Sequence, residues 1–141
     1  MLALIPEPRR GGRLEILCLA PHCDDIEIGC GATVVRLAAR YPRARFTWLT
    51  LSGDDVREPE TRAAASRLLR AAGQADVYVE RFRGSYFPHA GPELKDRVEA
   101  LKSVQPDLIL THCRHDLHQD HRVVNELTWN AFRDHAILEY E

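Results

Sequence analysis

Two short polar segments of this sequence carry the residue types that bind metal ions and move protons. Residues 21–25 read PHCDD, and four histidines fall within the ten residues from His112 to His121. Two imidazoles and one carboxylate suit a divalent metal of the zinc type, with a fourth position left for water. A second carboxylate beside the metal could serve as the general base for that water. Together, the two segments predict a metal-assisted reaction of water.

Each segment also has a simpler interpretation when it is taken alone. Asp24 and Asp25 precede a predicted helix, where acidic side chains commonly cap the helix N-terminus. Four nearby histidines are, by themselves, most often a solvated stretch of surface. The choice between these interpretations depends on whether the fold brings the two segments together.

Apolar runs alternate with helical patterns along the chain. We expect strands at residues 14–20, 45–51, 75–82 and 107–112, helices near 32–41, 58–72, 93–104 and 120–133, and the start of a fifth strand in 136–141. This alternation predicts an α/β fold, a Rossmann-like doubly wound, mostly parallel sheet with strand order about 3-2-1-4-5 and helices on both faces. The first and fourth strands are neighbours in that order. The polar segments that follow them therefore face one crevice, which favours the metal site.

The length and composition of the chain exclude several functional classes. The 141 residues fit a single domain over 1–141, and the 45% hydrophobic content is that of a globular protein. The net charge of −2 gives no basic excess for binding nucleic acid. No apolar run reaches the ~18–20 residues of a membrane span, and the N-terminal MLALIPEPRRGGR has the reverse order of a signal peptide. We therefore expect a cytoplasmic protein without a membrane span, and the sequence is compatible with a homo-oligomer.

Other chemistries at the first strand–helix turn have little support. A dinucleotide site needs G-x-G-x-x-G there, whereas this turn holds PHCDD and its glycines are Gly29 and Gly31, so we expect no nucleotide cofactor. The P-loop and the G-x-S-x-G elbow are also absent from the sequence. A nucleophilic Cys23 or Cys113 stays open as an alternative, although no residue stands out as its base.

The two polar segments resemble the paired motifs of the PIG-L/LmbE-like zinc-dependent N-acetylglucosaminyl deacetylases. PHCDDIEIGCGAT at 21–33 is similar to the family's first motif, A/P-H-P-D-D-x-E-x-G-x-G-G. PDLILTHCRHDLHQDH at 106–121 is similar to the second motif, which follows a strand and ends in H-P-D-H. Cys23 and Gln119 stand where the family usually has proline, and neither position is a ligand type. The resemblance covers the chain from about residue 14 to its end.

The resemblance implies a metal site and a base. His22 and Asp25 of the first motif and His121 of the second would bind Zn²⁺, although the same ligand set suits other divalent metals. Asp24 would be the general base that takes a proton from the attacking water. Three protein ligands plus one water is also the general pattern of catalytic zinc.

Three further roles are implied by the resemblance. His118 would stabilise the oxyanion that forms at the acetyl carbonyl, and Asp120 would orient His118. Arg57, in the loop after the second strand, would contact the sugar, although a solvated arginine is an equally good interpretation of that position.

The function implied is removal of the acetyl group from an N-acetylglucosamine-type conjugate, either a small molecule or a glycoconjugate. The products would be acetate and a free amine. A non-catalytic metal-binding or regulatory domain with a relic site is the alternative. Relatives in the family generally continue beyond this length, so a form truncated at its C-terminal end and a naturally minimal member both stay open.

Overall fold

The structure, a computed structural model, describes residue 8 and residues 12–141 of the chain. Most of the N-terminal segment judged above for a signal peptide lies outside these residues. None of the helices in the described part combines the length and apolarity that crossing a membrane requires. The elements, in chain order, are β1 (Glu15–Ala20), α1 (Asp25–Arg40), β2 (Arg45–Thr50), α2 (Arg57–Leu68), β3 (Gln74–Val79), η1 (Phe87–His89), α3 (Gly91–Ala100), η2 (Leu101–Val104), β4 (Leu108–His112), α4 (Gln119–Phe132) and β5 (Ala136–Tyr140).

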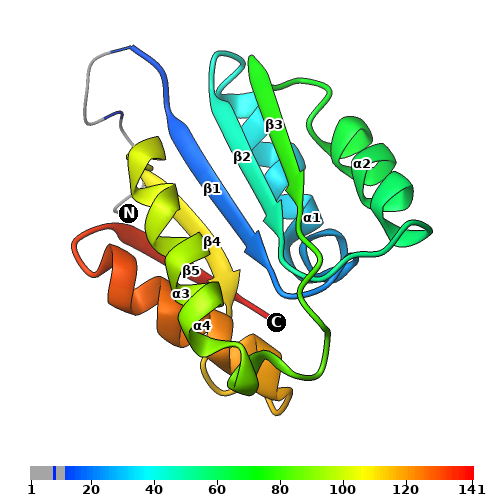
Figure 1. Ribbon diagram of the computed structural model, residues 1–141. Helices are drawn as coiled ribbons and strands as arrows, with labels where there is room; N and C mark the ends of the chain where they lie inside the picture. Colours follow the sequence, from blue (N-terminus) through cyan, green and yellow to red (C-terminus); the bar gives the residue numbers. More distant parts are fainter. Residues whose placement is uncertain (1–7, 9–11) are drawn as a thin grey trace.

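The strands form one parallel sheet in the order β3-β2-β1-β4-β5. This confirms the predicted α/β class and the predicted order 3-2-1-4-5. The chain moves outward from β1 to β3 and then returns to place β4 on the other side of β1, so the topological switch point lies between β1 and β4. Helices α1 and α2 cover one face of the sheet, and α3 and α4 cover the other (Figure 1).

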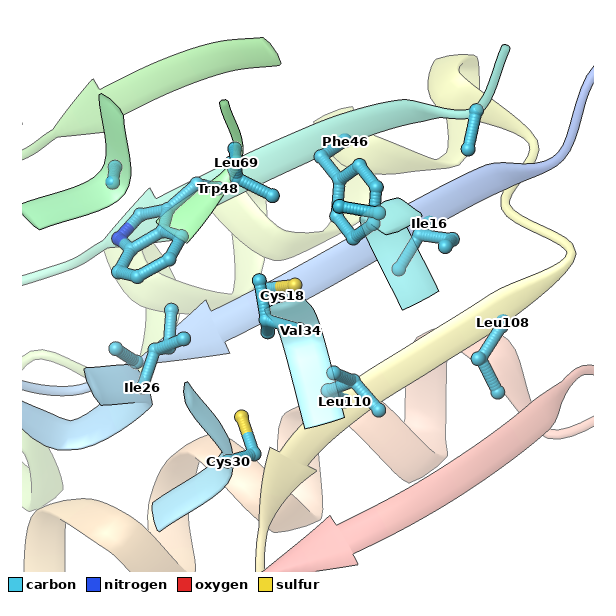
Figure 2. Packing of buried hydrophobic residues seen from close by; sticks show 14 of the residues in the cluster. Ile16, Cys18, Ile26, Cys30, Val34, Phe46, Trp48, Leu69, Leu108 and Leu110 are labelled. Carbon is cyan, nitrogen blue, oxygen red and sulfur yellow. The ribbon is translucent and has the colours of Figure 1, made fainter. Parts of the chain in front are cut away.

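The inner strands are buried on both faces, which explains their nearly continuous apolar sequences. Ile16 and Cys18 of β1 point into the core beneath α1, where Figure 2 shows them beside Phe46 and Trp48 of β2. The alternate residues of β1, such as Leu17, join the separate core beneath α3 and α4. The rigid centre of the sheet therefore fixes where β1 and β4 end, and the polar loops start from those ends.

Helix α1 begins at Asp25, well before the predicted start at residue 32. Glycines are poor helix formers, which is why the sequence pattern assigned Gly29 and Gly31 to a loop. The helix accommodates them with a kink at Cys30, where φ is −140° and ψ is 16°. A Cβ atom on residue 29 would overlap the ring of Tyr140 in β5, so glycine allows the first turns of α1 to approach the sheet. The earlier start places Asp25 in the first helical turn.

Candidate active site

The loops that follow β1 and β4 meet at the carboxyl edge of the sheet, and the three predicted metal ligands come together there. His22 lies in the loop after β1, Asp25 begins α1, and His121 lies in the first turn of α4. The Nδ1 atom of His22 is 3.2 Å from Nε2 of His121 and 3.4 Å from Oδ2 of Asp25. The Nε2 atom of His121 is 3.6 Å from Oδ1 of Asp25.

These separations fit a single divalent ion. A zinc ion with nitrogen and oxygen ligands at about 2.0–2.2 Å in a tetrahedral arrangement places its ligand atoms about 3.3–3.5 Å from one another. Among the described residues, His121 belongs to two sets of potential ligands with donor atoms within 4.8 Å of one another. One set adds His22 and His118, and the other adds Asp25 and His112. The rings of His112 and His118 each stack on the ring of His121, so both residues border the same cluster.

A carboxylate contacts the far nitrogen of each of the two predicted histidine ligands. The Nε2 atom of His22 lies 3.1 Å from Oδ2 of Asp120, and Nδ1 of His121 lies 2.9 Å from Oδ2 of Asp116. A carboxylate accepts the N–H of such a ring and leaves the lone pair on the other nitrogen. In both residues that other nitrogen faces the cluster, so the carboxylates hold both rings with their free nitrogens toward one another.

The role expected for Asp120 differs from its position in the structure. Its fully buried carboxylate contacts His22 and accepts hydrogen bonds from the backbone N–H groups of Ser85 and Phe87. Only its backbone N–H reaches His118, donating to Nδ1 at 3.2 Å. The Asp120 carboxylate therefore contacts the ring of His22 and not that of His118, because its oxygens face His22 and the N–H groups of Ser85 and Phe87.

His118 is the N-cap residue of α4 and is exposed to solvent. Because Nδ1 accepts the backbone N–H of Asp120, the proton of the neutral ring lies on Nε2. The ring stacks on His121 with centroids 4.6 Å apart and an interplanar angle of 22°. An exposed N–H donor thus stands directly beside the predicted metal ligands.

Burial and neighbouring charges shift the pKa values of the three predicted ligands in different directions. Burial alone would raise the pKa of Asp25, but the imidazoles of His112 and His22 hold it well below its usual range. The pKa of His121 is lowered, mainly by burial. Burial would also lower the pKa of His22, but its contacts with Asp25 and Asp120 raise it. The cluster therefore combines an ionised carboxylate with an imidazole that favours the neutral form.

Asp24 lies at the entrance of the cluster with 54% of its side chain exposed. Although it occupies the N-cap position of α1, its side chain makes no capping hydrogen bond. The carboxylate of Asp25 accepts the backbone N–H of His22 at 2.7 Å. The helix-capping interpretation thus accounts for neither residue. Instead, the Asp24 carboxylate accepts a hydrogen bond from Nη2 of Arg57 at 3.1 Å, which places Arg57 at the entrance too.

Sequence reasoning left two residues of this site without a role. The structure buries His112 to 4% exposure and stacks it on His121 with centroids 3.7 Å apart. Its Nε2 atom is 3.4 Å from Oδ2 of Asp25, and neither ring nitrogen has a hydrogen-bond partner within the described residues. Asp116 was not singled out. Its Oδ1 atom accepts the backbone N–H of His118 at 2.7 Å, and such a turn is typical of an aspartate two residues before a helix cap.

The cluster borders a pocket of about 500 Å³. His22, Cys23 and Asp24 line one side of it, and Arg57, Arg81 and Arg83 are among the residues lining the rest. The pocket is open to solvent on the side that Asp24 lines.

The matched region of the chain spans both polar segments. Residues 17–132 match the family model described as PIG-L, GlcNAc-PI de-N-acetylase. The chain belongs to this family. One relative is the uncharacterized deacetylase YaiS of Escherichia coli K12, which is 31% identical over 144 residues, covering 92% of this chain and 74% of that protein. The predicted family is thus confirmed.

Solved structures confirm the PIG-L fold. The conserved protein TT1542 from Thermus thermophilus has a TM-score of 0.65 and 26% identity, covering 90% of this chain and 61% of that one. The N,N'-diacetylchitobiose deacetylase from Pyrococcus horikoshii has a TM-score of 0.62 and 24% identity, covering 83% of this chain and 48% of that one. This PIG-L chain therefore spans less than two thirds of the length of either structure.

Proposed function

We propose that the chain is a zinc-dependent N-deacetylase. It hydrolyses the acetamido group of an N-acetylglucosamine-type conjugate to give acetate and a free amine. The observation that carries the proposal is the convergence of His22, Asp25 and His121. Asp24 lines the pocket next to His22, and the ring of His118 packs against those of His22 and His121. The family description and the names of YaiS and of the chitobiose deacetylase support deacetylation of N-acetyl sugars.

His22, Asp25 and His121 would hold the metal. A zinc ion bound there would supply a Lewis acid for the amide carbonyl and would lower the pKa of a water molecule. Asp116 and Asp120 keep the rings of His121 and His22 in the orientation that binding requires. These buried contacts leave the side of the cluster next to the pocket for the substrate.

Asp24 and His118 would move the proton and stabilise the developing charge. Asp24 accepts a proton as water adds to the carbonyl carbon, and it delivers that proton to the nitrogen as the carbon–nitrogen bond breaks. The Nε2–H of His118 donates to the carbonyl oxygen as it becomes negative. Arg57 donates a hydrogen bond to Asp24 and lines the pocket, where it would contact the sugar.

The organisation of the chain is consistent with one catalytic unit. We propose that residues 1–141 form a single domain, because one sheet with its covering helices carries every residue named above. The reaction therefore draws each of these groups from a single scaffold.

Metal analysis combined with an acetate-release assay over a panel of N-acetyl sugars tests this function. We expect one zinc per chain and acetate release that stops when a chelator removes the metal. A chain that binds one zinc and releases no acetate from any sugar conjugate would instead be the relic metal-binding domain.

A further inference from the structure

The pocket beside His22 is lined by the carboxylates of Asp24 and Asp54 and by more guanidinium groups than these two carboxylates can balance. Three arginines line it: Arg57 is the first residue of α2, whereas Arg81 and Arg83 follow β3.

Two of these arginines already have carboxylate partners. Nη2 of Arg57 donates to Asp24 at 3.1 Å, and Nη2 of Arg81 donates to Glu58 at 2.7 Å. These pairs largely balance the charge of both guanidinium groups. Their positions are thus explained by contacts within the chain.

Arg83 is different, because no carboxylate in the described part of the chain forms an ion pair with it. Its guanidinium lies over the ring of Tyr86, 3.6 Å from the ring centroid. An arginine stacked on an aromatic face is held in one plane, and the N–H groups at its edge stay available as donors. That planar fork matches the two oxygens of a carboxylate or a phosphate.

The backbone fixes Arg83 and Tyr86 in this arrangement. The N–H of Tyr86 donates to the carbonyl of Arg83 at 3.3 Å and closes a turn in which Ser85 has a φ of 65°. A left-handed conformation is unfavourable for serine and persists when surrounding contacts hold it. Here the N–H of Ser85 donates to the carboxylate of Asp120, which also contacts His22. The arginine is therefore tied to the metal cluster through a fully buried side chain.

We propose that Arg83, stacked on Tyr86, binds an anionic group carried by the N-acetyl sugar conjugate, either a phosphate or a carboxylate. This inference rests on the function proposed above, because the pocket is the one that Asp24 borders. The preferred substrates are accordingly negatively charged conjugates and not neutral amino sugars.

The test is the binding of three probes to the zinc-loaded chain, measured by titration calorimetry. The probes are N-acetylglucosamine, which is neutral, N-acetylglucosamine 1-phosphate, and N-acetylmuramic acid, which carries a carboxylate. We expect at least one anionic probe to bind about tenfold more tightly than the neutral sugar, as for a charge-assisted bidentate contact. The stronger anionic probe identifies whether phosphate or carboxylate is the group recognised.

Variants assign that preference to one side chain. Arg83→Gln should reduce the ratio of neutral to anionic dissociation constants about tenfold, and Arg83→Lys should restore part of it, because lysine keeps the charge but not the fork. Arg70→Gln, an exposed arginine beyond the far end of α2, should leave the ratio unchanged.

A wild-type chain without any preference for the anionic probes would overturn the subsite. So would a preference that persists in Arg83→Gln, since the anion would then bind the metal or another cation. Acetate release from the same probes separates this inference from the proposed function. If anion binding depends on Arg83 and no acetate is released, the subsite is supported and the deacetylase function is contradicted. If acetate is released and anion binding does not depend on Arg83, the function is supported and the subsite is contradicted.

Discussion

Two regions of the carboxyl edge hold their charges in different ways. After β1 and β4, the side chains of Asp25 and Asp120 are 11% and 0% exposed, and each contacts an imidazole of the cluster. After β2 and β3, the charges of the pocket rim pair with one another in solvent, and the side chain of Arg57, for example, is 46% exposed. Removing one partner of a buried ion pair leaves the other charge buried and unpaired, whereas the charges of exposed pairs are screened by water.

This difference in burial suggests that the buried region serves the reaction and that the exposed rim serves substrate recognition. The buried region fixes ring orientation and ligand charge, so changes there should have large effects on metal binding. The ion pairs of the rim are exposed and screened by water, so changes there should alter which substrate is bound. Arg83 is the exception on the rim, because a turn anchored on Asp120 holds it. We therefore expect the effects of substitution to decrease from the buried cluster outward.

Removing a ligand from the buried cluster should have the largest effect. His121→Ala should weaken zinc binding at least about a thousandfold, because His121 belongs to both potential ligand sets. Zinc should then raise the unfolding temperature of the wild-type chain but not of the variant. Competition with a chromophoric chelator measures the affinity. An unchanged dissociation constant in a folded variant would remove His121 from the ligand set.

Asp24 lies where the two regions meet. Its substitution should lower turnover without changing metal binding. Asp24→Asn should lower kcat about 10²–10⁴-fold, because the amide cannot accept the proton. Zinc stoichiometry should stay at the wild-type value, since the side chain is half exposed and contacts Arg57 rather than the cluster. Acetate release at saturating substrate is the readout, and full activity of this variant would rule out Asp24 as the base.

The carboxylate behind His121 should have an intermediate effect. Asp116→Asn should weaken zinc binding about 10–100-fold, since the ring of His121 would lose the acceptor that fixes its proton on Nδ1. Asp96→Asn, an exposed aspartate on α3, is the matched control and should bind zinc like the wild type. Equal affinity of both variants would mean that Asp116 serves only the turn before α4.

Glu139 of β5 should give the smallest effect, because its side chain is partly exposed at 21%. Burial alone would raise its pKa, but hydrogen bonds from Arg114, Asn125 and Trp129 lower the pKa of Glu139 from 4.5 to about 2. A lowered carboxyl pKa contributes stability above pH 4.5 that is lost as the pH falls toward 2. Glu139→Gln should therefore destabilise the fold by about 1 kcal/mol at pH 7.

Urea unfolding at pH 7 and at pH 3 checks this dependence. The difference between the wild type and Glu139→Gln should shrink at the lower pH. A difference that stays the same at both values would show that the glutamate acts by packing and not by charge.

Patterns within short segments made much of the fold predictable. The alternation of apolar runs and helical spacing predicts a parallel α/β sheet. The common strand order of such sheets places the first and fourth strands side by side. Residues of the two motifs meet for the same reason. The start of α1 was not predictable, because Gly29 and Gly31 have poor helix propensity and only their packing against Tyr140 and α2 explains them.

Side-chain contacts between segments that are distant in the chain could not be predicted from the sequence. Asp120 was expected beside His118, two positions away, but its carboxylate reaches His22 across 98 residues. Asp116 contacts His121 only because α4 begins where it does. In the sequence, Arg83 looks like an ordinary loop arginine. Only the structure shows that the turn at Ser85 places its guanidinium over the ring of Tyr86. Side-chain partners of this kind depend on loop geometry, which local propensity does not specify.

X-ray absorption spectroscopy of the zinc-loaded chain tests the central claim most directly, because it identifies the atoms bound to the metal. We predict two imidazole nitrogens and two oxygens at about 2.0–2.2 Å, from His22, His121, Asp25 and one water. Three imidazoles would bring in His112 or His118 and contradict the assigned ligand set. A sulfur ligand at about 2.3 Å would contradict it as well, since it would require Cys23 or Cys113.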